Sequence, residues 1–174
     1  MVWIAGAAAY GTESHFNTRI PALMAVYPLM GLIAVFLTGA TLVFAVLILW
    51  HGGSRLRPAF RLSVGLGLVL TFVLTVAVAA YMARGPGHAI GHLSGTSTVP
   101  VMGWARDGGD LRVAHFFAAH ALHGVPAVGF VASRLLPENA ARLAVWAAAL
   151  LYAAFVVAVF AQAVTGHPFL PLAG

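Results

Sequence analysis

Long apolar runs alternate with short polar breaks along almost the whole chain. The runs cover about residues 22–50, 59–83, 111–135 and 140–164. A helix needs about 20 apolar residues to cross the hydrocarbon core of a bilayer, and each run supplies that length. The pattern therefore predicts an all-α fold, an integral membrane four-helix bundle, with a single transmembrane domain over residues 1–174.

Helix-starting and helix-ending residues mark the connections between the predicted spans. The only long connection covers residues 84–110, and the other two are short turns. Asp110 occupies the position expected of an N-cap residue before the third span. Within that span Pro126 predicts a kink, because proline cannot donate to the helix ladder. Residues 1–20 hold an apolar stretch too short to cross and no positive n-region, so we expect an interfacial tail.

Composition supports the membrane assignment and excludes several kinds of chemistry. Hydrophobic residues make up 61% of the chain and charged residues 7%, against about 25% charged residues in soluble domains. The nine basic residues are all arginines, scattered near span ends, which suits contact with a lipid bilayer and not nucleic-acid binding. Without lysine the chain cannot carry a lysine Schiff base. Without cysteine it has no disulfides, thiolate metal sites, covalently attached c-type haem or cysteine-ligated iron–sulfur clusters.

Arginine placement predicts the orientation of the bundle. The two short connections are denser in arginine than the tails and the long loop. Cytoplasmic loops carry an excess of positive residues, so we expect both short connections in the cytoplasm and both termini outside. The arginines of the short connections are Arg55, Arg57, Arg61, Arg134 and Arg142. We expect the bacterial cytoplasmic membrane, with residues 84–110 facing the periplasm.

Histidines concentrate on the predicted outer side, and this clustering is the main clue to function. Seven of the eight lie there: His15, His88, His92, His115, His120, His123 and His167. Ionisable residues within membrane helices are costly and usually functional. With about 100° and 1.5 Å per residue, His120 and His123 lie about 60° apart and can share a face, and His115 lies about 7 Å further out. A structural role is the alternative, with His115 solvated at the headgroups and the deeper rings bonded to a free backbone carbonyl or a neighbouring hydroxyl.

Two cofactor classes suit these residues. Haem b needs an axial histidine or methionine and arginines for the propionates, so the predicted cofactor-binding residues are His115, His120, Arg84 and Arg112. A transition metal such as copper would take imidazole ligands on the oxidising face. The candidate metal ligands are His88, His92, His115, His120 and His123. His88 and His92 have the i, i+4 spacing of a helical chelate, which the surrounding glycines disfavour.

We therefore expect a membrane redox protein or subunit that holds haem b or copper at a histidine-rich outer site for electron transfer. One alternative is a copper-handling membrane protein. Another is a cofactor-free accessory subunit of a larger energy-transducing complex, with other membrane-protein subunits as partners. A membrane di-iron oxygenase is disfavoured, because the spacing of the histidines resembles desaturase histidine boxes only loosely and no His-His pair occurs. The sequence names no substrate.

One segment resembles a known pattern. Residues 108–122 read Gly-Gly-Asp-Leu-Arg-Val-Ala-His-Phe, then three further residues, then His-Ala-Leu. This segment is similar to one found in small bacterial multi-span membrane proteins of unassigned function. In that pattern the position of His123 is more often glutamine, so the resemblance favours His115 and His120 as site residues. It implies no activity.

Overall fold

The computed structural model describes residues 5, 6, 9, 11, 21–50, 56–85, 87–91 and 97–171, with the backbone alone for residues 21–25. Internal contacts divide the chain into two units, Met1–Ala40 and Thr41–Gly174, and each is described by itself. The predictions for most of the N-terminal tail, His15, Arg55 and His92 concern residues outside this description.

The first predicted span forms one long helix, α2, over Pro21–Trp50. Its segment Val26–Trp50 is long and apolar enough to cross a membrane. Within it the hydroxyl of Thr38 donates to the Ala34 carbonyl one turn earlier, at 2.7 Å. Such a bond satisfies a hydroxyl without a partner outside the helix, so the helix stays compatible with lipid.

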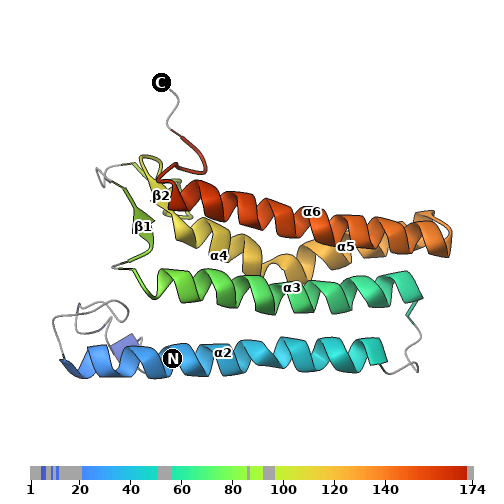
Figure 1. The fold of residues 1–174 in the computed structure, drawn as a ribbon, viewed down its shortest axis with the longest axis horizontal. Coiled ribbons are helices and arrows are strands. Elements are labelled where there is room, and N and C mark those ends of the chain that lie inside the picture. The colour runs from blue at the N-terminus through green and yellow to red at the C-terminus, as the bar shows by residue number, and fades with distance from the viewer. Residues whose placement is uncertain are drawn as a thin grey trace. The chain divides into compact units, whose positions relative to one another are not determined.

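Two further helices of spanning length belong to the second unit, α3 over Pro58–Met82 and α6 over Glu138–Val164. Figure 1 shows α3 and α6 on either side of the pair of shorter helices formed by the third predicted span. Pro58 is the first residue of α3, a position that suits proline because its φ is already helical and its missing N–H is not needed. The Leu136-Pro137 turn precedes α6.

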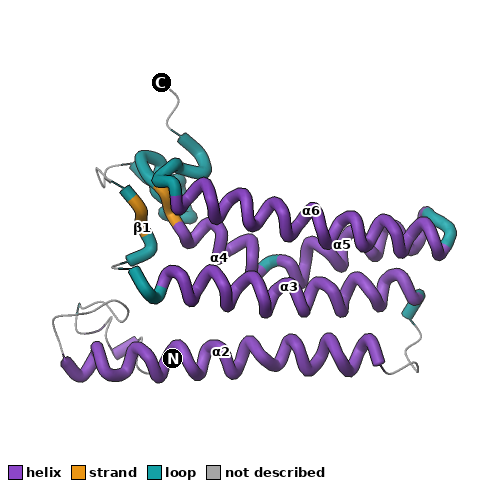
Figure 2. Tube along the Cα trace, in the orientation of Figure 1, coloured by secondary structure: helices purple, strands orange, loops and turns teal. Residues whose placement is uncertain are grey.

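The third predicted span consists of two helices, α4 (Leu111–Ala119) and α5 (Ala121–Leu135), which meet at His120 with a bend of 45°. The short loop between them is visible in Figure 2. Asp110 caps α4 as predicted, and its carboxylate accepts the backbone N–H of Arg112 at 3.0 Å. The kink predicted at Pro126, which lies inside α5, stays a prediction, and the 45° bend at His120 was not predicted.

Side-chain donors explain why the helix breaks at His120. The Tyr152 hydroxyl of α6 donates to the Phe117 carbonyl at 2.8 Å, where a continuous helix would accept the N–H of Ala121. His120 Nδ1 donates to the neighbouring carbonyl of Phe116 at 2.7 Å. Donors that enter the backbone ladder are an established cause of helix kinks. A contact from α6 therefore decides where α4 ends.

Small residues bring α5 close to α3. A Cβ atom on Gly67 of α3 would lie 2.9 Å from Cδ of Pro126, and a Cβ atom on Gly129 of α5 would overlap the Ser63 side chain. Close approach at small residues is the usual way in which membrane helices gain van der Waals contact. The two helices therefore form the tightest interface of the second unit at these positions.

One end of the second unit, which we call the hairpin end, comprises the end of α3, the start of α4, the end of α6 and the described parts of the long loop, residues 84, 85, 87–91 and 97–110. There β1 (Ala89–Ile90) pairs antiparallel with β2 (Gly109–Asp110). Thr98 and Ala105 form a further isolated bridge. Trp104 is buried here in a core that includes Val78, Val113, Ala114 and Val159. The described parts of the predicted loop thus have strand pairs and a core of their own.

The opposite end of the second unit, which we call the turn end, holds the start of α3, the end of α5 and the start of α6. A second core of Ala59, Ala132 and Ala141 lies there. The all-helical prediction is confirmed, with three helices able to span a membrane, or four if the bent pair α4 and α5 is one span. The four-helix bundle, the single domain and the outward termini stay predictions.

Candidate functional site

His120 stands at the joint between α4 and α5, with φ −90° and ψ 3°. Its ring stacks on Phe116 with centroids 4.0 Å apart and planes 28° from parallel. Because the Phe116 carbonyl can only accept, the 2.7 Å contact to His120 Nδ1 requires the proton on that nitrogen. In the neutral ring Nε2 then carries a lone pair, and the side chain is exposed. The backbone thus fixes the tautomer that a metal ligand needs.

His123 lies beside His120, as the helical spacing predicts. The two ring centroids are 5.5 Å apart with planes at 39°, and both side chains are exposed. The structural alternative gives these rings a free backbone carbonyl or a neighbouring hydroxyl as partner. His120 does contact a backbone carbonyl, that of Phe116 one turn earlier. The shared face is therefore present, and His120 is bonded to the backbone of its own helix.

His115 occupies the middle of α4 and is half-buried. Its Nδ1 atom is fully buried and has no hydrogen-bond partner among the described residues. A buried polar atom left without a partner costs about 1–3 kcal/mol, and such atoms are uncommon in folded proteins. The chain itself encloses this atom, so a group from outside could not reach Nδ1 in this conformation. The ligand role of His115 therefore stays a prediction from the sequence.

An aromatic cluster surrounds the start of α4 on the side of the folded loop. Trp104 packs edge-on against Phe116 with centroids 5.4 Å apart and against Phe169 at 6.1 Å. Phe116 and Phe117 lie 5.4 Å apart at 83°. Aromatic pairs of this kind contribute about 0.5–1.5 kcal/mol each beyond their buried area. They hold Phe116, and with it the carbonyl and ring that position His120.

Asp110 and Arg112 tie the folded loop to α4. The buried Asp110 carboxylate accepts from the Ala105 backbone N–H at 3.0 Å and pairs with the Arg112 guanidinium at 2.6 Å. Burial alone would raise the pKa of Asp110, but hydrogen bonds from the Arg112 side chain and from the Ala105 and Arg112 amides, with the charge of Arg112, hold it below its ordinary value. Arg112 also donates to the Gly103 carbonyl at 2.6 Å. Only Nη1 of the guanidinium is left for the propionate role predicted from the sequence.

The other predicted site residues are spread over the hairpin end. Arg84 is exposed just beyond α3, and His167 is exposed with Nδ1 3.1 Å from the Thr165 hydroxyl. His88 is half-buried, and its carbonyl accepts the Leu111 N–H at 2.9 Å. The next residues form strand β1, so no helical chelate exists at His88.

The five predicted metal ligands are not assembled into one centre in the part of the chain that the structure describes. No three histidine, aspartate or glutamate side chains gather there as a metal site. His120 and His123 are brought together, and His115 shares their bent segment with an unpartnered nitrogen. A complete centre would therefore need a ligand from another chain or from outside these residues.

Sequence reasoning missed Tyr152, which determines the bend next to His120. Its ring lies so close to α5 that a Cβ atom on Gly124 would come within 2.6 Å of Tyr152 Cε2. A glycine in α5 and a single tyrosine in an alanine-rich helix were the available signals. Nothing in the spacing pairs these two positions, because they come from different helices.

No family model, curated protein or solved structure matches the chain. The resemblance of residues 108–122 to small bacterial membrane proteins stays a prediction. Function is therefore inferred from the residues of this chain and their geometry.

Proposed function

We propose that the protein is a membrane redox protein or subunit in which His120 is the first ligand of a haem b or transition-metal cofactor used in electron transfer. The observation that carries this proposal is the fixed imidazole of His120, with Nδ1–H on the Phe116 carbonyl and the side chain exposed. Histidines that ligate metals almost always donate their other ring nitrogen to a carbonyl or carboxylate in this way. The Phe116 carbonyl would orient the ring and raise its basicity.

The position of His120 supports a covered site. His120 lies nine residues after Leu111, or about 14 Å along the helix, which is near the middle of a hydrocarbon core about 30 Å thick. Exposed imidazoles at that depth are costly unless something covers them. A cofactor, or a cofactor shared with a neighbouring chain, would supply that cover for both His120 and His123.

The residues present supply part of a site for either cofactor class. His120 and His123, on one exposed face, offer two imidazoles of the kind that copper accepts. His120 would hold the iron of a haem, together with a second ligand from another part of the protein or from another chain. Either group, when bound, supplies one-electron chemistry. Within the chain, Phe116 orients the ligand, and the aromatic cluster next to it holds Phe116 in place.

A cofactor-free accessory subunit of a larger energy-transducing complex is the second candidate. It is favoured by the same exposed pair, because His120 and His123 could bond to polar groups of a neighbouring subunit in place of a cofactor. A copper-handling membrane protein would use the two imidazoles as a transfer site. The three functions differ in the haem or metal that the isolated protein is expected to contain.

The test is an absorbance spectrum, oxidised and dithionite-reduced, recorded first on membranes and then on detergent-purified protein, with metal analysis of both. Haem b predicts a Soret band that sharpens on reduction, and a metal site predicts stoichiometric copper or iron without that band. If membranes that contain large amounts of the protein held no more haem, copper or iron than control membranes, the redox proposal would be overturned. The accessory subunit would then be favoured.

The proposed location is the bacterial cytoplasmic membrane with the hairpin end in the periplasm. The turn end carries more of the described arginines than the hairpin end: Arg57, Arg61, Arg134 and Arg142 against Arg84, Arg106 and Arg112. One arginine at each end is paired with a carboxylate, Arg112 with Asp110 and Arg142 with Glu138, so the difference between the ends is kept. The positive-inside tendency therefore places the turn end in the cytoplasm.

A further inference from the structure

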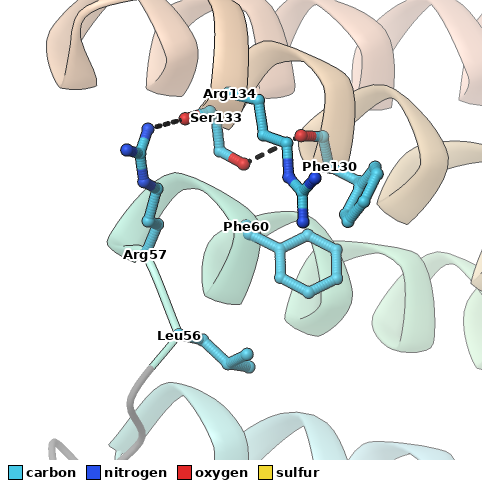
Figure 3. Close-up of a pocket in the computed structure, with 6 residues that line it drawn as sticks. All are labelled: Leu56, Arg57, Phe60, Phe130, Ser133 and Arg134. Carbon is cyan, nitrogen blue, oxygen red and sulfur yellow. Dashed lines mark hydrogen bonds between the residues drawn. The ribbon is translucent and has the colours of Figure 1, made fainter.

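A hollow at the turn end lies between the first turn of α3 and the last turns of α5. It has a volume of about 460 Å³ and is lined by Leu56, Arg57, Phe60, Phe130, Ser133 and Arg134. Figure 3 shows both guanidinium groups and both phenyl rings around the same space. The hollow is far from His120 along α5 and takes no part in the proposed cofactor site.

Two positive charges border this hollow. The Arg57 guanidinium donates to the Ser133 carbonyl, and the Arg134 guanidinium lies 4.2 Å above the centre of the Phe130 ring. Neither is paired with a carboxylate anywhere in the described ranges, since Glu138 at this end is paired with Arg142 at 2.8 Å. Both arginines keep N–H groups that can reach an anion.

The apolar wall of the hollow is built from two aromatic rings. Phe60 and Phe130 meet edge to face with centroids 5.8 Å apart, and Leu56 lies beside them. A small inorganic anion would gain nothing from contact with this apolar wall. A ligand with a phosphate at one end and hydrocarbon at the other would fill both parts.

We propose that the hollow binds the phosphate group of an anionic phospholipid, with Arg57 and Arg134 on the phosphate and the phenyl rings against the glycerol and the start of the acyl chains. Arginine forks match phosphate oxygens in a bidentate manner and are less strongly hydrated than lysine. Basic pockets between membrane helices on the cytoplasmic side bind anionic headgroups in other proteins. This site is independent of any cofactor at His120.

The experiment measures lipid binding by native mass spectrometry of the detergent-purified protein, with phosphatidylglycerol, phosphatidylcholine or inorganic phosphate added. We expect phosphatidylglycerol to bind at least about tenfold more tightly than phosphatidylcholine. Both lipids carry the phosphate, but the choline cation of phosphatidylcholine cancels its net charge and would lie close to two arginines. In Arg134→Gln the preference for phosphatidylglycerol over phosphatidylcholine should fall by about tenfold. Arg142→Gln is the matched control, because it removes the same charge from the same end but from a residue already paired with Glu138.

The outcomes separate the possible ligands. An equal loss in the two variants would mean general attraction to a positive surface and would overturn the site. Phosphatidylcholine binding as tightly as phosphatidylglycerol would also overturn it. If millimolar inorganic phosphate displaced phosphatidylglycerol, and if Leu56→Ala bound phosphatidylglycerol as tightly as the wild-type protein, the hollow would be a site for free phosphate. This result would contradict the lipid proposal. Arg57→Gln is a second variant, and a folded Arg57→Gln protein with full lipid preference would contradict the assigned role of Arg57.

Discussion

Replacing Asp110 with alanine is expected to destabilise the hairpin end by about 3 kcal/mol. The change removes the N-cap bond to the Arg112 amide, a loss of about 1 kcal/mol. It leaves the buried Ala105 amide without its acceptor, which costs about 1–3 kcal/mol. The ion pair adds at most about 1 kcal/mol, because the Arg112 side chain is 40% exposed and solvent screens it. Asp110→Asn keeps an acceptor at the cap and should cost about 1 kcal/mol.

The same contacts predict a dependence on pH. The pKa of Asp110 is lowered in the folded protein, so the carboxylate stabilises the fold above its unfolded pKa, which is about 3.9. This contribution is lost as the pH falls from there through the lower folded pKa. Asp110→Asn should lack that acid-sensitive part of the stability, whereas the wild-type protein should show it.

The assay is equilibrium unfolding in mixed micelles with increasing sodium dodecyl sulfate, followed by circular dichroism at pH 7 and between pH 5 and 3. Glu138→Gln is the control, since it removes an exposed i, i+4 pair that contributes about 0.3–0.5 kcal/mol. If Asp110→Ala cost no more than Glu138→Gln, the account of Asp110 as the buried link between loop and helix would be refuted. The same conclusion would follow if Asp110→Asn were more costly than Asp110→Ala.

Three further predictions test the fold around the site. Gly109→Ala should destabilise the protein by about 3 kcal/mol, because its Cβ would overlap the backbone of α6, whereas Gly87→Ala, with open space around it, should be near neutral in the same unfolding assay. Tyr152→Phe should cost about 1 kcal/mol and increase amide exchange protection at Ala121, because the Phe117 carbonyl becomes available to that amide; unchanged exchange would contradict the explanation of the bend. Since the chain has no cysteine, single cysteines at Asn139 and Ser97 can be labelled in intact cells with a membrane-impermeant maleimide. Ser97→Cys should react and Asn139→Cys should not, and the reverse pattern would invert the proposed orientation.

The spans were predictable because the bilayer imposes one requirement on every one of them. Any crossing helix needs about 20 apolar residues, and the runs that meet this length became α2, α3, the α4 and α5 pair, and α6. Local capping rules placed Asp110 before α4 correctly, since an N-cap bond involves only residues two or three apart. These features depend on short stretches of sequence.

The bend at His120 could not be read from the sequence. Pro126 was the local signal, yet the ladder is interrupted by the hydroxyl of Tyr152, which lies 35 residues after the carbonyl that it occupies. The folded loop was missed for a similar reason. Its strands are two residues long. The Asp110 side chain binds the Ala105 amide and Arg112, and no periodicity in the sequence predicts such hydrogen bonds.

The candidate site was predicted in part. Helical spacing brought His120 and His123 onto one face, and their rings are 5.5 Å apart. The five-residue metal set was an inference from clustering along the chain, and chain order does not fix which side chains converge. The partner of His120 Nδ1 was within reach of local reasoning, because Phe116 lies one turn earlier. Its importance depended on a bend that was not foreseen.

The most direct test of the central claim is the cofactor content of His120→Ala membranes, compared with wild type and with His167→Ala. We expect His120→Ala to lose the haem or metal, added imidazole to restore it, and His167→Ala to retain it, because the His167 ring is exposed beyond the end of α6 with Nδ1 at 3.1 Å from the Thr165 hydroxyl. A folded His120→Ala protein that keeps its full cofactor content would contradict the assignment of His120 as a ligand. So would equal losses in both variants without rescue by imidazole.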